Sequence, residues 1–325
     1  MKTNSDTTTR ITRIGFAAII ALACLLLIRA TDVLAGVALF ANPTDTISVS
    51  GSLLLTNAAT YEARVFFTQP VTNFVGGVFN EWTDNQEDKD LFFYPGILGG
   101  FSFPVNEADG DIESTNLTFK LNQWHHVAYV YDGAQERLYL DGALVGSRPA
   151  SGSIGNAGGI PVVGASPRLE PYSGPRPSFL GYIDTLRISD VARYSGTNFS
   201  PPTGKLAADG ATLLLFNFNE APGSTTTEDL SGNGHTGTLG VGFAGSTSPQ
   251  FTLDPAPPYL NITSAGQLVL GAPIGSTNCI QYVFDLTVTN WQTLTNLVVE
   301  QSPLEITDPQ FGQVPQKFYR AVRLQ

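Results

Sequence analysis

Four carboxylates at alternate positions are the first residues in this sequence whose spacing could do chemistry. Residues 107–113 place Glu107, Asp109, Asp111 and Glu113 two apart, so an extended strand would carry them on one face. Two such carboxylates can serve a glycoside hydrolase as nucleophile and acid. Alternatively, the clustered oxygens of Asp109, Asp111 and Glu113 could hold Ca²⁺. A glycine interrupts the run and only one residue in it is strongly apolar, so a solvated acidic loop is the favoured interpretation.

A second acidic tract directly follows a tryptophan. Trp82 precedes residues 84–90, which begin with Asp84 and contain four acidic side chains. An indole ring can stack on a pyranose while carboxylates accept hydrogen bonds from its hydroxyl groups, so Trp82 and Asp84 are candidate carbohydrate-binding residues. The alternative is that Trp82 ends a strand and packs inward, with the acids merely solvated.

The sequence contains no other group of residues with the types and spacing of a catalytic or metal-binding site. His125 and His126 are adjacent, and neighbouring strand residues point to opposite faces, so they cannot both reach one zinc ion without a bulge. The third histidine, His235, is remote in sequence. The chain has no Gly-x-Ser-x-Gly elbow, no phosphate-binding glycine loop and no cysteine pair, and no catalytic residue is therefore assigned.

The elements that would position these residues are strands. Residues 121–146 read LNQWHHVAYVYDGAQERLYLDGALVG, in which aromatic and β-branched runs are separated by Asp132-Gly133 and Asp141-Gly142. Asp-Gly tolerates the positive φ angles of a tight reversal, so this stretch predicts a three-stranded meander. Tyr61-Glu62-Ala63-Arg64-Val65 lies in a further expected strand, with Tyr61, Ala63 and Val65 on one face.

These runs resemble the laminin-G-like (concanavalin A-like) jelly roll. Members carry a similar Gln-Trp-His-His-Val-Ala, Tyr-Asp-Gly and Leu-Tyr-Leu-Asp-Gly series, and an aromatic-Glu-Ala-aromatic strand in which Arg64 here replaces the common Trp. The resemblance covers about residues 36–204. It implies an all-β antiparallel sandwich in which the two histidines are framework residues. Proteins that resemble it bind carbohydrates or protein partners on a concave sheet or rim loops, sometimes through Ca²⁺.

Composition agrees with short strands and turns. Of 325 residues, 33 are Gly and 21 Pro, while Lys and Arg total only 17 and the net charge is −11. The basic footprint of a nucleic-acid-binding protein is absent. Cys24 falls in the N-terminal segment and Cys279 stands alone, so no intramolecular disulfide framework is expected in the mature chain.

The N-terminus has the pattern of a secretory signal. Lys2, Arg10 and Arg13 precede the uncharged run 14–28, and small residues end at Ala35. We expect residues 1–35 to be removed and the protein to be secreted or held at the cell surface, without a membrane span in the mature chain. An uncleaved anchor is the alternative, although the run is shorter than the ~20 residues that a span needs.

The rest of the chain divides into two β units. A jelly roll is expected over 36–253, a Pro-rich linker over 254–258, and a small β-sandwich-like module over 259–325. Expected strands include 75–82, 91–94 and 101–105 in the first unit, and 267–270, 282–288, 297–300 and 318–324 in the second. Thr289-Asn290-Trp291-Gln292-Thr293-Leu294 and Lys317-Phe318-Tyr319-Arg320 resemble the terminal modules of secreted bacterial surface proteins.

These features predict an exported, non-enzymatic adhesion protein that recognises carbohydrate or an extracellular protein partner through the jelly roll. The candidate binding residues are Trp82, Asp84, Asp109, Asp111 and Glu113, and the last three are also candidate Ca²⁺ ligands. Two alternatives stay open. One is a polysaccharide-degrading glycoside hydrolase that uses the acidic run, and the other is a structural envelope protein that packs against copies of itself.

Overall fold

The computed structural model describes the chain from Gly36 to Leu324 with gaps. The described residues are 36–71, 76–82, 89–102, 105, 110–156, 158–165, 177–255, 258–263, 267–272, 276–287, 290–301, 303–313 and 316–324. These residues form strands, turns and loops and contain no helix, so none of the part described has a helix able to cross a membrane. The predicted all-β class is confirmed.

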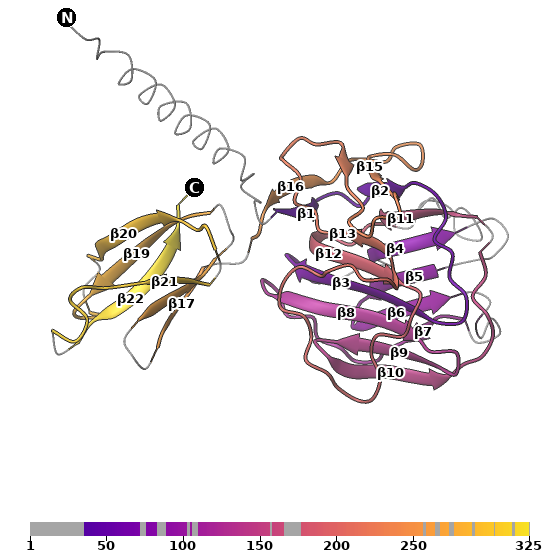
Figure 1. Ribbon diagram of the computed structural model, residues 1–325, viewed down its shortest axis with the longest axis horizontal. Coiled ribbons are helices and arrows are strands. Elements are labelled where there is room, and N and C mark those ends of the chain that lie inside the picture. Colours follow the sequence, from indigo (N-terminus) through magenta and orange to yellow (C-terminus); the bar gives the residue numbers. More distant parts are fainter. Residues whose placement is uncertain are drawn as a thin grey trace, which may run out of the picture.

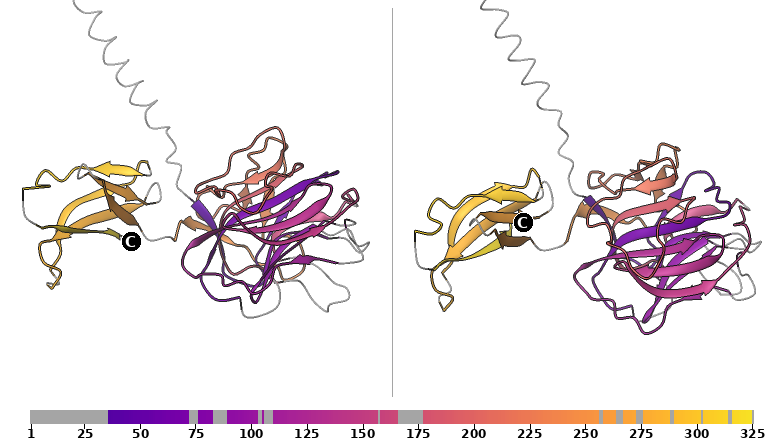
Figure 2. Two further views of the ribbon diagram at one scale, coloured as in Figure 1. Left: turned by 90° about the horizontal axis from the view of Figure 1, so that it is seen from below. Right: turned by 60° about the horizontal axis from the view of Figure 1, so that its bottom comes forward.

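Two antiparallel sheets form the first unit and lie as stacked layers (Figures 1 and 2). The first sheet has the order β10-β9-β8-β3-β12-β1-β16, and β13 also pairs with β12. Its strands are β1 (Gly36–Phe40), β3 (Ala59–Phe67), β8 (Trp124–Tyr131), β9 (Gln135–Leu140), β10 (Ala143–Pro149), β12 (Gly181–Ser189), β13 (Thr212–Phe216) and β16 (Gln250–Leu253).

The second sheet has the order β14-β15-β2-β11-β4-β5-β6-β7. Its strands are β2 (Thr46–Val49), β4 (Gly76–Trp82), β5 (Lys89–Tyr94), β6 (Ile97–Ser102), β7 (Ile112–Glu113), β11 (Ile160–Gly164), β14 (Thr226–Thr227) and β15 (Gly237–Leu239). Residues beyond 204 thus contribute strands to both sheets of this unit.

The core lies between the sheets and follows from the alternation in β3. Tyr61, Ala63, Val65 and Phe67 are buried and point toward the second sheet, which contributes residues such as Phe93. The Phe67 ring lies 5.0 Å from that of Phe93, edge to face. The remaining side chains of β3 alternate with these and point to the opposite face of the first sheet, which is its outer face.

The predicted meander is present as β8, β9 and β10. Asp141 and Gly142 form the two-residue turn between β9 and β10, with φ angles of 51° and 79°. Both are positive, as the preferred turn of a two-residue hairpin requires. A Cβ atom on Gly142 would come within 2.1 Å of the Phe199 carbonyl oxygen, so close packing also demands glycine here.

Three strand predictions were displaced, one of them the strand expected over 297–300, which is β20 (Gln292–Val298). The strand expected over 101–105 is β6, at Ile97–Ser102, because Pro95 and Gly96 make a tight turn directly after β5 and Gly96 takes a φ of 74°. The strand expected over 282–288 is β19 (Thr277–Val283). It ends early because the Asp285 carboxylate accepts a hydrogen bond from the Thr287 amide and turns the chain.

The C-terminal residues form two three-stranded sheets, β17-β18-β21 and β20-β19-β22. The strands not yet introduced are β17 (Tyr259–Ile262), β18 (Leu268–Gly271), β21 (Leu304–Ile306) and β22 (Phe318–Arg323). Their shared core contains Leu268, Leu270, Ile280, Val299 and Ile306. The sequence predicted neither β17 nor β21.

A buried ion pair holds the last strand of this C-terminal unit. Lys317 Nζ lies 2.5 Å from Asp308 Oδ2, and both side chains are almost fully buried. The Tyr319 hydroxyl donates to the same oxygen at 2.6 Å, and Lys317 Nζ lies 3.9 Å from the centre of the Tyr282 ring. Burial raises the pKa of Asp308, but the hydrogen bonds from Lys317 and Tyr319 outweigh it and leave the pKa below its ordinary value.

Candidate functional site

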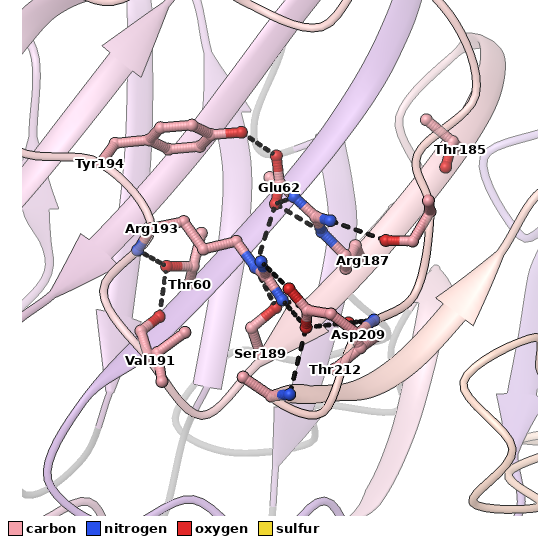
Figure 3. A network of polar contacts seen from close by, with 12 residues as sticks. Thr60, Glu62, Thr185, Arg187, Ser189, Val191, Arg193, Tyr194, Asp209 and Thr212 are labelled. Atoms are coloured by element: carbon pink, nitrogen blue, oxygen red, sulfur yellow. Dashed lines mark hydrogen bonds and ion pairs between the residues drawn. The ribbon is translucent and has the colours of Figure 1, made fainter.

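The densest polar cluster among the described residues lies on the outer face of the first sheet (Figure 3). At its centre is Glu62 of β3, which points away from the core formed by Tyr61 and its neighbours. Arg187 comes from the adjacent β12, and Arg193 and Tyr194 come from the segment that leaves that strand. This cluster therefore links β3 to the segment after β12 that crosses over it.

Every oxygen of the Glu62 carboxylate has a partner. Oε1 accepts from Arg187 Nε at 2.8 Å, while Oε2 accepts from the Tyr194 hydroxyl at 2.6 Å and from His126 Nε2 at 2.9 Å. Glu62 is fully buried, which by itself raises its pKa, but the hydrogen bond from His126 and the charge of Arg187 lower the pKa below its ordinary value. The carboxylate is therefore ionised and enclosed by donors.

Arg193 extends the cluster to the surface. Its guanidinium donates to both oxygens of the half-exposed Asp209, at 2.8 and 2.7 Å, and holds the pKa of that carboxyl well below its usual range. Its amide donates to the Thr60 hydroxyl oxygen at 3.0 Å, which fixes the backbone against β3. The Glu62 carboxylate, which is enclosed by these donors, anchors the segment that follows β12 and is not presented to a substrate.

The two adjacent histidines point to opposite faces, as their positions in a strand predict. His126 contacts Glu62 on the outer face, whereas His125 lies 2.7 Å from Asp141 Oδ2 through Nδ1 and 2.9 Å from the Lys120 carbonyl oxygen through Nε2. Burial alone lowers the pKa of His125, but the bonds to Asp141 and Lys120 raise it above the ordinary value. Both ring nitrogens face acceptors, so the folded protein favours the imidazolium form.

Asp141→Asn is therefore expected to destabilise the protein more near pH 6 than near pH 9. The raised pKa of His125 means that the pair stabilises the fold fully below the unfolded pKa of about 6.5, and that this stabilisation disappears as pH rises through the folded pKa. Asparagine keeps the acceptor for the His126 amide and tolerates the positive φ of this position. Melting temperatures of both proteins across this pH range test the prediction, and a constant difference would contradict it.

A row of three aromatic side chains crosses the same outer face at the other end of β3. Phe66 pairs in register with Trp124 of β8 on one side and with Tyr182 of β12 on the other. The ring centres of Phe66 and Trp124 are 5.3 Å apart, and those of Phe66 and Tyr182 are 5.8 Å apart, both edge to face. Phe66 is 4% exposed, whereas Trp124 and Tyr182 are half-buried.

Charged groups border this aromatic row. Arg64 lies with its guanidinium carbon 4.6 Å from the centre of the Trp124 ring, and it pairs with Asp184 at 2.5 Å. Lys205 also pairs with Asp184 and donates to three backbone carbonyl groups. The Trp124 indole nitrogen donates to Asp254 Oδ1 at 3.0 Å. The residue that replaces the family's common Trp, Arg64, thus covers one ring of the row.

Residues 41–196 match the family model described as the concanavalin A-like lectin/glucanases superfamily. These residues have a concanavalin A-like fold and resemble the laminin-G-like family. The family resemblance expected from the meander is thereby confirmed for this part of the chain. A search of curated proteins gave no match.

Solved structures with a similar fold come from varied sources. A candidate carbohydrate-binding protein from Bacteroides ovatus is 16% identical over 68% of this chain and 60% of that protein, with a TM-score of 0.49. A heptameric SAP-like pentraxin from Limulus polyphemus is 19% identical over 51% and 80%, with a TM-score of 0.36. Domains LG4-5 of the mouse laminin alpha1 chain are 16% identical over 52% and 47%, with a TM-score of 0.39. At these identities a shared activity does not follow.

The predicted site residues of the laminin-G-like domain are only partly described. Trp82 is the last residue of β4, and Glu113 is the exposed last residue of β7 at the edge of the second sheet. Asp111 precedes β7 and is half-buried. Asp84 and Asp109 lie outside the described residues. Within the described ranges, no three His, Cys, Asp or Glu side chains gather to hold a metal ion, so calcium stays a prediction.

Neither the Glu62 cluster nor the aromatic row was predicted from the sequence. Glu62, His126 and Arg187 come from strands more than 60 residues apart, and their proximity depends on the register of β3 with β8 and β12. One signal was available: Glu62 and Arg64 alternate with the apolar positions of the strand, which indicates a polar outer face. The segment that follows β12 covers this face beside Thr60 and Glu62.

Proposed function

We propose that this chain is an exported, non-enzymatic binding protein whose laminin-G-like domain recognises carbohydrate or another cell-surface partner. The observation that carries the proposal is the aromatic row of Trp124, Phe66 and Tyr182, in register on three neighbouring strands. Trp124 and Tyr182 are half-buried, and the Arg64 guanidinium lies against one face of the Trp124 ring. Aromatic rings present flat apolar faces on which a pyranose can stack, and their polar edges can exchange hydrogen bonds with sugar hydroxyl groups. The fold, which lectins share, supports the same conclusion.

The state of Glu62 supports the non-enzymatic part of the proposal. A glycoside hydrolase needs an acid and a second carboxyl group about 5–9.5 Å apart across a bound sugar. Glu62 has no exposed surface, and its oxygens are occupied by His126, Arg187 and Tyr194. Glu62 therefore serves the fold and is not a candidate for the acid or the nucleophile of a hydrolase.

The first test is binding of the purified protein to a glycan array, in Ca²⁺ and again in EDTA. Binding that EDTA does not change is the expected result, because the aromatic row needs no metal ion. Binding that EDTA abolishes would keep carbohydrate as the ligand but move the site to the acidic residues Asp109, Asp111 and Glu113.

Two results would contradict the proposed function. Absence of glycan binding in both conditions, together with self-association in sedimentation, would favour a structural envelope protein. Release of reducing ends from a polysaccharide by the wild type, and its loss in Glu113→Gln, would instead establish a glycoside hydrolase. Mass analysis of the exported protein tests the localisation, with Gly36 expected as its first residue.

A further inference from the structure

We infer that the aromatic row on the outer face of the first sheet is the glycan site, and that it takes a neutral chain of pyranose sugars. This inference rests on the proposed function and adds the location of the site and the class of glycan. The acidic residues predicted from the sequence are not part of it.

The spacing of the row suits consecutive sugar units. Trp124 and Tyr182 lie on strands that flank β3, so their backbones are about 10 Å apart on ordinary strand spacing. Phe66 lies between them and is buried by its two neighbours, whose rings meet it at interplanar angles of 63° and 85°. The two half-buried rings are thereby held apart by a rigid spacer. Their separation is comparable to the length of a disaccharide unit.

The Tyr182 hydroxyl has no hydrogen-bond partner among the residues that the structure describes. Five other tyrosines of the jelly roll use their hydroxyl groups in hydrogen bonds to side chains or carbonyl groups; these are Tyr61, Tyr129, Tyr131, Tyr139 and Tyr194. Tyr182 makes no such bond with any residue in the described ranges, and its ring packs edge-on against Phe66. A hydroxyl group beside a stacking surface can both donate to and accept from a sugar hydroxyl.

The charges around the row select for a neutral glycan. Two cations, Arg64 and Lys205, share the carboxylate of Asp184, and Trp124 donates to the carboxylate of Asp254. Arg323 also lies beside Asp254 and donates to its backbone carbonyl group. Each of these three cations is thus already engaged by a carboxylate or a carbonyl oxygen, rather than held ready for a sulfate or uronate group. The whole chain carries a net charge of −11, which adds repulsion toward acidic glycans.

The deciding experiment compares three variants on neutral and sulfated glycans of the array, followed by calorimetry on the best neutral ligand. Tyr182→Ala is expected to weaken binding about tenfold through the loss of ring and hydroxyl, and Tyr182→Phe by a smaller factor, since the ring remains. Phe311→Ala removes an exposed aromatic ring from the C-terminal unit and is expected to leave affinity unchanged. An unchanged melting temperature confirms that Tyr182→Ala is folded.

The outcomes separate this inference from the proposed function. Neutral-glycan binding that Tyr182→Ala leaves intact would overturn the site while the binding function stands. Binding restricted to sulfated glycans would overturn the neutral class. If the wild type binds no glycan at all, the proposed function fails first and the inference fails with it.

Discussion

Replacing Glu62 with alanine is expected to lower the free energy of unfolding by about 3–5 kcal/mol, the usual cost of breaking a buried ion pair by removing one partner. The substitution leaves the buried Arg187 guanidinium without its carboxylate, and it removes the acceptor of Tyr194 and His126. Each of these groups has already lost its water, so the penalty exceeds that of a surface pair. Chemical denaturation of wild type and variant measures the difference.

The matched control for Glu62 lies in the same cluster. Arg193 lies near two carboxylates, with its Nε 3.9 Å from Glu62 Oε1, and Asp209→Ala removes the second of them. Because Asp209 is 52% exposed, its loss is expected to lower the free energy of unfolding by about 1 kcal/mol or less. Equal losses for the two variants would show that burial of Glu62 does not set its contribution. Glu62→Gln keeps the size and one acceptor, and we expect an intermediate loss.

Asp308→Ala is expected to destabilise the C-terminal unit by about 3–5 kcal/mol, because it leaves the buried Lys317 ammonium unpaired. The Tyr319 hydroxyl loses its acceptor at the same time, so the attachment of β22 weakens. Faster amide hydrogen exchange in β22, with unchanged protection in β3 and β8, is the expected measurement. Uniform loss of protection across the protein would contradict a local effect.

Two further variants test the cause of that loss. Lys317→Met combined with Asp308→Leu removes both charges and keeps apolar volume, so stability is expected to recover in part. Asp285→Ala removes a fully exposed carboxylate from the same unit, and little change is expected there beyond the turn at Thr287.

The parts of the fold that could be predicted are those specified by residues that are close together in the sequence. The meander was identified because Asp141-Gly142 encodes a reversal and because the strands beside it are dense in β-branched and aromatic residues. β6 was displaced because the turn at Pro95-Gly96 was not weighed against the apolar residues that follow it. Local turn chemistry therefore determined strand positions more strongly than apolar content did.

The candidate site could not be predicted because it depends on register. Trp124, Phe66 and Tyr182 form a row only once three strands are aligned, and a shift of one residue would turn each ring to the opposite face. Periodicity within one strand shows which residues share a face, but not which residue lies opposite on the next strand. The acidic run attracted attention because its members are close in sequence.

The order in which β1 acquires its neighbours has a consequence for folding. Gly36 pairs with Leu253, and β1 lies between β12 and β16, both of which are synthesised much later. Closing such distant contacts is slow, because the loop entropy is lost before the pairing energy is gained. A chain that emerges N-terminus first can pair β1 with β12 once Ile183 has been made, but one edge of β1 stays unpaired until Leu253 has been made. The first sheet therefore reaches its final topology only after the chain has been made as far as Leu253.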